Sequence, residues 1–296
     1  MNPELTSGTS GTSTDEPAGG TGEELLAVEG LVQHYHRRGG AWKRLGGHGS
    51  SVVKAVDGVD LSVVRGETLG LVGESGCGKS TLSRCAAGLL RPTSGTVRYA
   101  GQALDGPPDR AQRRLVQMVF QDPYSSLNPR MTVGQTLGEV LRYHRVVPRP
   151  QVADRVRELV DLVGLPPRAV DQLPRSFSGG QRQRIGIARA LALEPQVLIA
   201  DEPVSALDVS VQANIINLLL DLKQSLGLSM LFVSHNMAVV RQISDRIAVM
   251  HSGVVVEEGS TDQVFTSPQH DYTRLLLSSV PRLATRRIPA VEAATA

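Results

Sequence analysis

The stretch from Gly73 to Thr81 constrains the fold of this chain more than any other, and it reads G-E-S-G-C-G-K-S-T. It fits the pattern G-x-x-x-x-G-K-[ST], in which glycines let backbone N–H groups turn toward a polyphosphate. The apolar run Thr68 to Val72 predicts a buried strand before it, and Ser80 to Leu90 predicts a helix after it. This order directs the positive end of the helix dipole at the anion. The stretch therefore predicts a nucleotide phosphate site and not a turn that only joins two elements.

The polar side chains of this loop have definite places in such chemistry. Lys79 can reach the β- and γ-phosphates, and the Ser80 hydroxyl can ligate Mg²⁺. Cys77 lies at a helix start among phosphate-binding amides, a position that lowers the pKa of a thiol. Cys77 and Cys85 are the chain's two cysteines. We expect them to be small packing residues, which is typical of a protein from a reducing compartment.

Composition bounds the class of protein. The 296 residues are 41% hydrophobic, enough for one large domain or two modest ones. A net charge of +2 with a pI of about 8.7 is too mild to indicate nucleic-acid binding. No run approaches the ~18 apolar residues of a membrane span, and the N-terminus lacks a signal-peptide pattern. We therefore expect a soluble chain that reaches a membrane only by binding a protein that spans it.

Antiparallel β-structure is predicted near the N-terminus. Glu24 to Tyr35 predicts one strand or a pair of strands, and Val52 to Val64 shows strand-like alternation. Residues 1–23 are polar and predict a disordered tail, residues 37–51 with Trp42 a mobile loop, and residues 283–296 a flexible tail. Tyr35 is either a stacking partner for an adenine or an ordinary tyrosine at the end of a strand.

A helical insertion follows. From Thr132 to Asp171 the apolar residues recur at helical spacing. Ser178 is a candidate N-cap, and Gly179 and Gly180 then open a further helix. Because a helix start offers backbone N–H groups, this is a second geometry suited to an anion.

Two further strands carry polar groups at their ends. Val197 to Ala200 leads into Asp201 and Glu202, and Ser229 to Val233 leads to His235. Such residues are more often solvated or structural, but a phosphate loop on the same sheet favours function. Asp201 could hold Mg²⁺, and Glu202 could take a proton from water. His235 would lie at the carboxyl edge of the sheet, where such folds bind ligands.

These motifs together resemble the ATP-binding subunits of ABC transporters. The order is G-E-S-G-C-G-K-S-T, Gln121, F-S-G-G-Q, V-L-I-A-D-E-P, S-A-L-D and S-H, and S-G-G-Q separates this family from other P-loop ATPases. The resemblance covers about residues 24–282. The segments F-Q-D-P-Y-S-S-L-N-P-R and S-P-Q-H-D-Y-T-R-L-L-L-S-S-V-P are similar to the oligopeptide/dipeptide importer branch.

The resemblance implies a nucleotide-binding dimer with two ATP molecules, each between the loop of one subunit and the signature of the other. It implies that Glu202 is the catalytic base, that His235 contacts the γ-phosphate, and that Gln121 senses Mg²⁺ and the attacking water. Asp201 and Ser80 would hold the metal with Gln121, and Tyr35 would stack on adenine. The implied ATP-binding set further comprises Gly73, Ser75, Gly76, Cys77, Gly78, Lys79, Ser80, Thr81, Ser178, Gly179, Gly180 and Gln181.

Departures from the family pattern are small. Phe177 stands where many relatives have Leu, and Asn236 replaces a frequent Asp. Some relatives carry a C-terminal cysteine cluster for an iron–sulfur centre, but no cysteine follows Cys85, so we expect no cluster.

The expected fold is α/β: a P-loop core sheet, an antiparallel β subdomain, an α-helical subdomain at about 122–193, and a C-terminal extension at about 253–282. The expected function is ATP hydrolysis that drives import of oligopeptides, dipeptides or a related small solute such as a nickel complex or a sugar. The implied partners are a second, related ATP-binding subunit, two transmembrane permease subunits and, indirectly, a solute-binding protein. We expect the chain itself to be peripheral, at the cytoplasmic face of the cell's inner membrane.

Two alternatives are weaker. Non-transport ABC ATPases that act on DNA or ribosomes usually carry a coiled-coil insertion or two tandem ATPase domains, and this chain has one set of motifs and a short interval from loop to signature. An inactive partner subunit is disfavoured because Lys79, Glu202, His235 and S-G-G-Q are intact.

Overall fold

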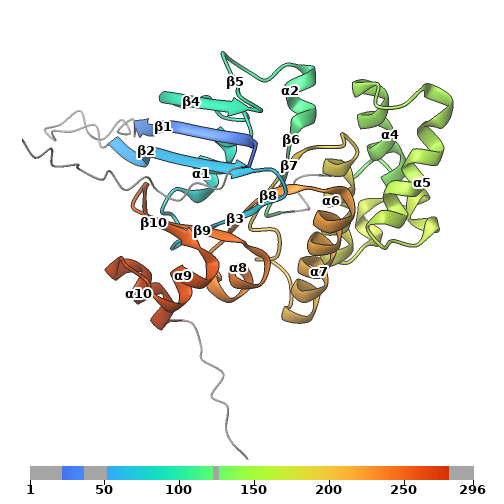
Figure 1. Ribbon diagram of the computed structural model, residues 1–296. Helices are drawn as coiled ribbons and strands as arrows, with labels where there is room; N and C mark the ends of the chain where they lie inside the picture. The colour runs from blue at the N-terminus through green and yellow to red at the C-terminus, as the bar shows by residue number, and fades with distance from the viewer. Residues whose placement is uncertain (1–21, 37–51, 123–126, 280–296) are drawn as a thin grey trace, which may run out of the picture.

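The computed structural model describes residues 22–36, 52–122 and 127–279, which form two β-sheets and the helices around them (Figure 1). The predictions for residues 1–21, for residues 37–51 with Trp42, and for residues 280–296 lie outside the described residues. So do residues 123–126 of the loop that follows Gln121.

A six-stranded sheet forms the centre of the molecule, in the order β10-β9-β3-β8-β7-β6. β3, β7 and β8 pair in parallel and every residue in them is buried, which explains their nearly continuous apolar sequences. β10 joins the edge antiparallel to β9. The strands are β3 (Thr68–Val72), β6 (Val116–Val119), β7 (Val197–Asp201), β8 (Ser229–Ser234), β9 (Arg246–His251) and β10 (Val254–Ser260).

A four-stranded antiparallel sheet, in the order β2-β1-β4-β5, lies above the first (Figure 1). The N-terminal segment Glu24–His36, for which one strand or a pair was predicted, forms one strand. The pairing shifts register around Gly30, whose φ of +53° is accessible to glycine at little cost. The strands are β1 (Glu24–His36), β2 (Val52–Val64), β4 (Ser94–Tyr99) and β5 (Gln102–Ala103).

Helix α1 (Lys79–Ala86) lies between the two sheets and contacts β1 and β2 on one side and β7 and β8 on the other. Leu82, Cys85 and Ala86 are buried in the same apolar cluster as side chains of both sheets. The start of this helix, which ends the glycine-rich loop, is therefore fixed by the core.

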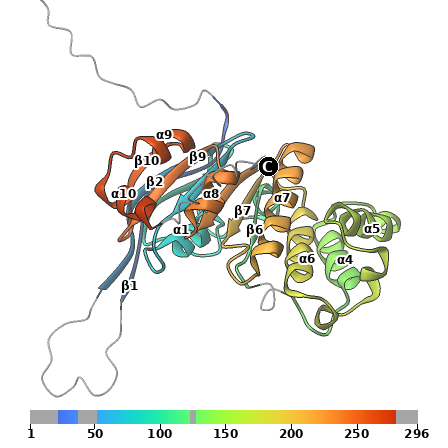
Figure 2. The ribbon, with the colours of Figure 1, turned by 90° about the horizontal axis from the view of Figure 1, so that it is seen from below.

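Three helices pack together beyond β6 and β7, at the right of Figure 1 and again in Figure 2. They are α4 (Val133–His144), α5 (Val152–Leu162) and α6 (Gly179–Leu191), and each contacts the other two. Leu137, Leu141 and Leu159 are fully buried among them, as the helical periodicity of this stretch predicts. Short 3₁₀ turns, at Arg149–Gln151, Pro167–Asp171 and Pro174–Ser176, lie between the helices. α7 (Val209–Leu226) packs on α6.

Helices α9 (Thr261–Thr266) and α10 (Asp271–Ser278) lie at the opposite end of the molecule from α4 and α5 in both views (Figures 1 and 2). α9 contacts β9 and β10, while α8 (Met237–Ile243) contacts β3 and β8 nearer the centre. A short helix, α2 (Arg110–Leu115), precedes β6. Within the described ranges, no helix has both the length and the apolar character needed to cross a membrane.

Candidate nucleotide-binding site

Four loops carry most of the predicted site residues to one edge of the six-stranded sheet. The glycine-rich loop follows β3, and Ser234 ends β8 beside it, since Val72 pairs with Ser234; His235 comes directly after β8. Asp201 ends β7 and pairs with Val233 of β8. Gln121 lies just after β6. Because these strands run parallel, their carboxyl ends bring the four loops together, as such sheets do at ligand sites.

Lys79 is the charged centre of the glycine-rich loop. Its side chain is almost fully buried, and Nζ donates hydrogen bonds of 2.8 Å to the carbonyl oxygens of Gly73 and Glu74. The ammonium group is thus enclosed by the loop's own backbone. A polyphosphate bound in the loop would meet this charge at short range and with little competing water.

Ser80 and Asp201 are joined across 121 residues of sequence. Ser80 Oγ donates a 3.0 Å hydrogen bond to Asp201 Oδ1. Burial raises the pKa of Asp201, against the opposing effect of the Ser80 hydroxyl. A hydroxyl and a carboxylate in contact are the oxygen donors that Mg²⁺ prefers. No cluster of three or more His, Cys, Asp or Glu side chains suited to a metal occurs in the described part of the chain, so the other ligands would come from phosphate and water.

Two glycines of the loop are required by their surroundings. A Cβ on Gly73 would lie 2.1 Å from the carbonyl oxygen of Met250, and a Cβ on Gly78 would lie 1.9 Å from that of Ala55. Gly78 also has a φ of +112°. The loop therefore touches the backbones of β9 and β2 where no side chain fits.

Glu202 is held by both its backbone and its side chain. Its φ is +46°, a strained value for a residue with a Cβ. The Glu202 carboxylate lies 3.2 Å from His235 Nδ1 and accepts a 3.3 Å hydrogen bond from Gln121 Nε2. The side chain is 11% exposed, while that of His235 is 48% exposed. A nearly buried carboxylate within hydrogen-bond reach of His235 and Gln121 is suited to accept a proton.

The expectation for the Cys77 thiol is wrong. Burial raises the pKa of Cys77, although the Lys79 ammonium opposes this. The prediction relied on the helix start and its backbone amides and did not account for burial, which leaves Cys77 only 9% exposed. Both cysteines are free and buried, as expected of packing residues.

The helix start predicted as a second anion-binding geometry is formed at Ser178–Gln181, and it lies apart from the glycine-rich loop. Ser178 caps α6: its Oγ accepts from Gln181 N, and Gln181 Oε1 accepts from Ser178 N. Within the part of the chain that the structure describes, no hydrogen bond or ion pair links Ser178–Gln181 to the loop at 73–81. Figures 1 and 2 both show α6 beside α4 and α5, away from α1. One chain thus carries two separate anion-binding geometries.

Tyr35 lies near the end of β1 in the four-stranded sheet and is 42% exposed. It pairs with Val53 of β2. The Tyr35 ring is exposed enough to contact a ligand, and its stacking on adenine stays a prediction.

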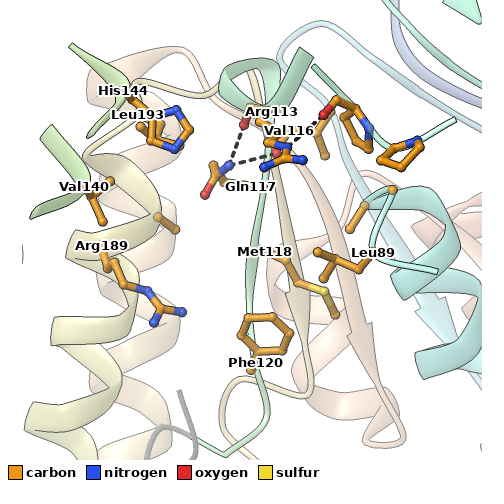
Figure 3. A pocket seen from close by; sticks show the side chains of 15 residues that line it. Leu89, Arg113, Val116, Gln117, Met118, Phe120, Val140, His144, Arg189 and Leu193 are labelled. Carbon is orange, nitrogen blue, oxygen red and sulfur yellow. Dashed lines mark hydrogen bonds between the residues drawn. The ribbon is translucent and has the colours of Figure 1, made fainter. Parts of the chain in front are cut away.

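A hollow beside the site is not lined by any predicted site residue (Figure 3). It lies between the end of α1, β6, α4 and α6. Leu89, Met118, Phe120, Val140 and Leu193 supply apolar walls, and Arg113, His144 and Arg189 supply polar ones. Burial, together with Arg110, Arg113 and Arg114, lowers the pKa of His144. Phe120 directly precedes Gln121, so the hollow adjoins the Gln121 loop.

One neighbour of the phosphate loop was not predicted from the sequence. Tyr272 in α10 accepts a hydrogen bond from the backbone N–H of Glu74. The segment S-P-Q-H-D-Y-T was singled out only as a mark of one branch of the family. No local pattern indicates that its tyrosine lies beside a loop 198 residues earlier.

Comparison with known proteins places this site in a family. The model described as "ABC transporter" matches residues 56–205, and "Oligopeptide/dipeptide transporter, C-terminal region" matches residues 256–295. The Oligopeptide transport ATP-binding protein OppF of Escherichia coli K12 is 51% identical over 261 residues, 87% of this chain and 78% of that protein. The protein of the same name from Lactococcus lactis is 47% identical over 268 residues, 89% of this chain and 83% of that protein.

A comparison with solved structures supports the same family. The dimeric structure of a post-hydrolysis state of the ATP-binding cassette MJ0796, bound to ADP and Pi, superimposes with a TM-score of 0.68 at 28% identity. The match covers 80% of this chain and 99% of that one. A P-loop sheet with an antiparallel β-sheet and a group of helices is thus an ABC ATPase fold, and the predicted fold class is confirmed.

The chain belongs to the ABC transporter family. It is an ATPase, and its nucleotide is ATP. The transport interpretation is confirmed over the alternative of an ABC ATPase that acts on DNA or ribosomes, because the two relatives above are transport proteins.

Proposed function

We propose that this chain powers the import of oligopeptides, dipeptides or a related small solute through a membrane permease. The observation that carries the proposal is the match of residues 256–295 to the C-terminal region of oligopeptide and dipeptide transporters. Two relatives named for oligopeptide transport, 51% and 47% identical over most of the chain, support it.

Residues of the glycine-rich loop would hold the nucleotide. The backbone N–H groups of the loop, with Ser75, Gly76 and Thr81, would surround the phosphates, and Lys79 would neutralise their charge. Ser80 and Asp201 would hold Mg²⁺, which would neutralise developing charge on the phosphate oxygens. The 3.0 Å contact between these two side chains supports this assignment.

Glu202 would accept the proton of the attacking water. Its carboxylate is nearly buried, and it lies within 3.3 Å of polar atoms of both His235 and Gln121. His235 would contact the γ-phosphate, while Gln121 would orient the water and sense Mg²⁺. Asp201 is less suited to this task because it contacts the Ser80 hydroxyl at the proposed metal site.

The active unit would be a dimer. Ser178, Gly179, Gly180 and Gln181 carry a helix start suited to phosphate, yet they do not reach the phosphate loop of their own chain. They would therefore serve the ATP held by a second, related subunit, and Tyr35 would stack on the adenine of its own ATP. The structurally similar protein MJ0796 is described as dimeric, which supports this arrangement.

The remaining partners would be two permease subunits and, indirectly, a solute-binding protein. The loop after Gln121 would touch a permease subunit, and the adjacent hollow of Figure 3 offers apolar walls for such a contact. The chain would thus be held at the cytoplasmic face of the cell membrane by other proteins.

Uptake measurements test the proposal. Deleting the gene in the cell of origin should abolish uptake of labelled oligopeptides or dipeptides. Wild-type protein should restore uptake, and Glu202→Gln should fail although it accumulates equally. If the deletion leaves peptide uptake intact and removes uptake of a nickel complex or a sugar, the solute is that one. If no uptake changes, the proposed transport role is wrong.

A further inference from the structure

The C-terminal helix α10 is bonded directly to the phosphate loop. The backbone N–H of Glu74 donates a 3.1 Å hydrogen bond to Tyr272 Oη. Tyr272 is 8% exposed, and its ring lies 3.9 Å from the ring of His251 at the end of β9, measured between centroids. Burial raises the pKa of Tyr272, so its hydroxyl stays neutral near pH 7. The contact is thus a partly buried hydrogen bond at the entry of the loop.

The position of Tyr272 is itself fixed by β10. The carboxylate of Glu257 accepts hydrogen bonds from the backbone N–H groups of Gln269 and His270, at 2.8 and 2.9 Å. His270 Nδ1 then accepts from the N–H of Tyr272 and caps α10. A chain of short contacts therefore runs from the edge strand through the first turn of α10 to Glu74.

The turn between β9 and β10 supports the loop from a second side. The N–H of Gly253 donates to the carbonyl oxygen of Cys77 at 3.0 Å. The carbonyl of Met250 lies against Gly73, where a Cβ would be only 2.1 Å away. Both ends of the segment from Gly73 to Cys77 thus touch the C-terminal part of the chain.

We propose that Tyr272 is a positioning residue for ATP binding: it holds the Glu74 amide so that the loop keeps its anion-binding form before the nucleotide arrives. The inference rests on the ATP site proposed above and extends it to the C-terminal region. A loop already ordered loses less conformational freedom on binding, which lowers the Kd. Once ATP is bound, its phosphates order the loop directly, so the hydroxyl should matter much less for the chemical step.

The substitution Tyr272→Phe tests this, because it keeps the ring against His251 and removes only the acceptor. The Kd for ATP should rise roughly two- to tenfold, the range expected for one net hydrogen bond. The kcat of the assembled transporter should stay within about twofold of wild type, so that the effect appears in KM.

Tyr99→Phe is the matched control. Tyr99 is 1% exposed, and its hydroxyl donates a 2.7 Å hydrogen bond to the carbonyl oxygen of Ala86, at the far end of α1. Tyr99→Phe removes the same hydroxyl group from a different buried apolar cluster, away from the Glu74 amide. Both variants should lose some thermal stability. Only Tyr272→Phe should weaken ATP binding and speed amide hydrogen exchange in the peptide that contains Glu74.

Lys79→Ala separates the proposed role of Tyr272 from the proposed ATP site. If Lys79→Ala loses ATP affinity while Tyr272→Phe binds ATP as tightly as Tyr99→Phe, the inference is overturned and the ATP site stands. If Tyr272→Phe and Tyr99→Phe weaken binding equally, the effect is general destabilisation and the inference is also overturned. If Lys79→Ala binds ATP normally, the ATP site and the inference both fall.

Discussion

Glu202 Oε1 and His235 Nδ1 lie 3.2 Å apart, although the two residues directly follow different strands of the central sheet. The contact exists because β7 and β8 are neighbours and both end at the same edge. Two groups able to handle a proton are thus within reach of each other, and their roles can be separated by substitution.

Glu202→Gln should bind ATP and barely hydrolyse it. The amide keeps the size and polarity of the side chain but cannot accept the proton of water. Loss of a general base typically costs ~10²–10⁴ in rate, or about 3–5 kcal/mol of barrier. ATP should still bind through Lys79 and the loop amides, so the closed ATP-bound dimer should accumulate. Single-turnover hydrolysis and ATP binding, measured on the same preparation, check both parts.

Lys79→Ala is the contrasting variant for that experiment, since it should lose ATP affinity itself. Hydrolysis by Glu202→Gln within a few-fold of wild type would contradict the assignment of the base. His235 would then be the leading candidate.

Gly78→Ala should destabilise the fold more than Gly66→Ala. Both glycines have positive φ, at +112° and +75°, so both substitutions cost about 1–2 kcal/mol in backbone strain. A Cβ at Gly78 would also lie 1.9 Å from the carbonyl oxygen of Ala55, whereas nothing lies within 4 Å of one at Gly66. Urea unfolding of the two variants measures the difference. Equal losses of stability would show that the loop does not touch β2 in solution.

Cys77 should react slowly with iodoacetamide near pH 7. Burial raises the pKa of Cys77, so little of the thiol is ionised there, and the rate should increase with rising pH as thiolate forms. ATP should slow the reaction. Cys85 is the internal control, because burial raises its pKa to about 11 and it lies away from the loop. Mass spectrometry of the labelled peptides, with and without ATP, follows both residues. Equal labelling of Cys77 in both conditions would contradict its place in the ATP site.

The sequence was sufficient to predict the local structure around the candidate site. A strand, a glycine-rich loop and a helix occur around Lys79 as predicted. Ser178 is the N-cap of α6 as predicted, because a cap depends on residues about three apart in the sequence. The end of β7 at Asp201 followed from its apolar run.

Long-range contacts left no such signal. The bond from Ser80 to Asp201 depends on strand order, which the sequence leaves open. The bond from Glu74 to Tyr272 depends on where the last helix packs. α2 was missed because it is short and buries none of its residues, so no apolar periodicity marks it. The error at Cys77 has the same origin, since burial is a property of the packed loop.

Membrane attachment should depend on the permease. We expect the protein to appear in the membrane fraction when the permease subunits are co-expressed and to leave it when they are absent. The reason is that attachment would be made by protein contacts near Gln121 and not by lipid. Fractionation followed by immunoblotting checks this. Retention on membranes without permease subunits, resistant to high salt, would count against it.

The backbone conformation at Glu202 sets the stability of the fold against the proposed catalytic role of its carboxylate. The left-handed conformation there, at φ +46°, costs any residue with a Cβ about 1 kcal/mol or more and costs glycine little. Glu202→Gly should therefore relax the turn after β7, while the same change removes the carboxylate beside His235. Selection for a stable fold alone would not keep glutamate at this position. A screen for heat-resistant variants of this chain should therefore select substitutions that stabilise the fold and remove the proposed catalytic carboxylate.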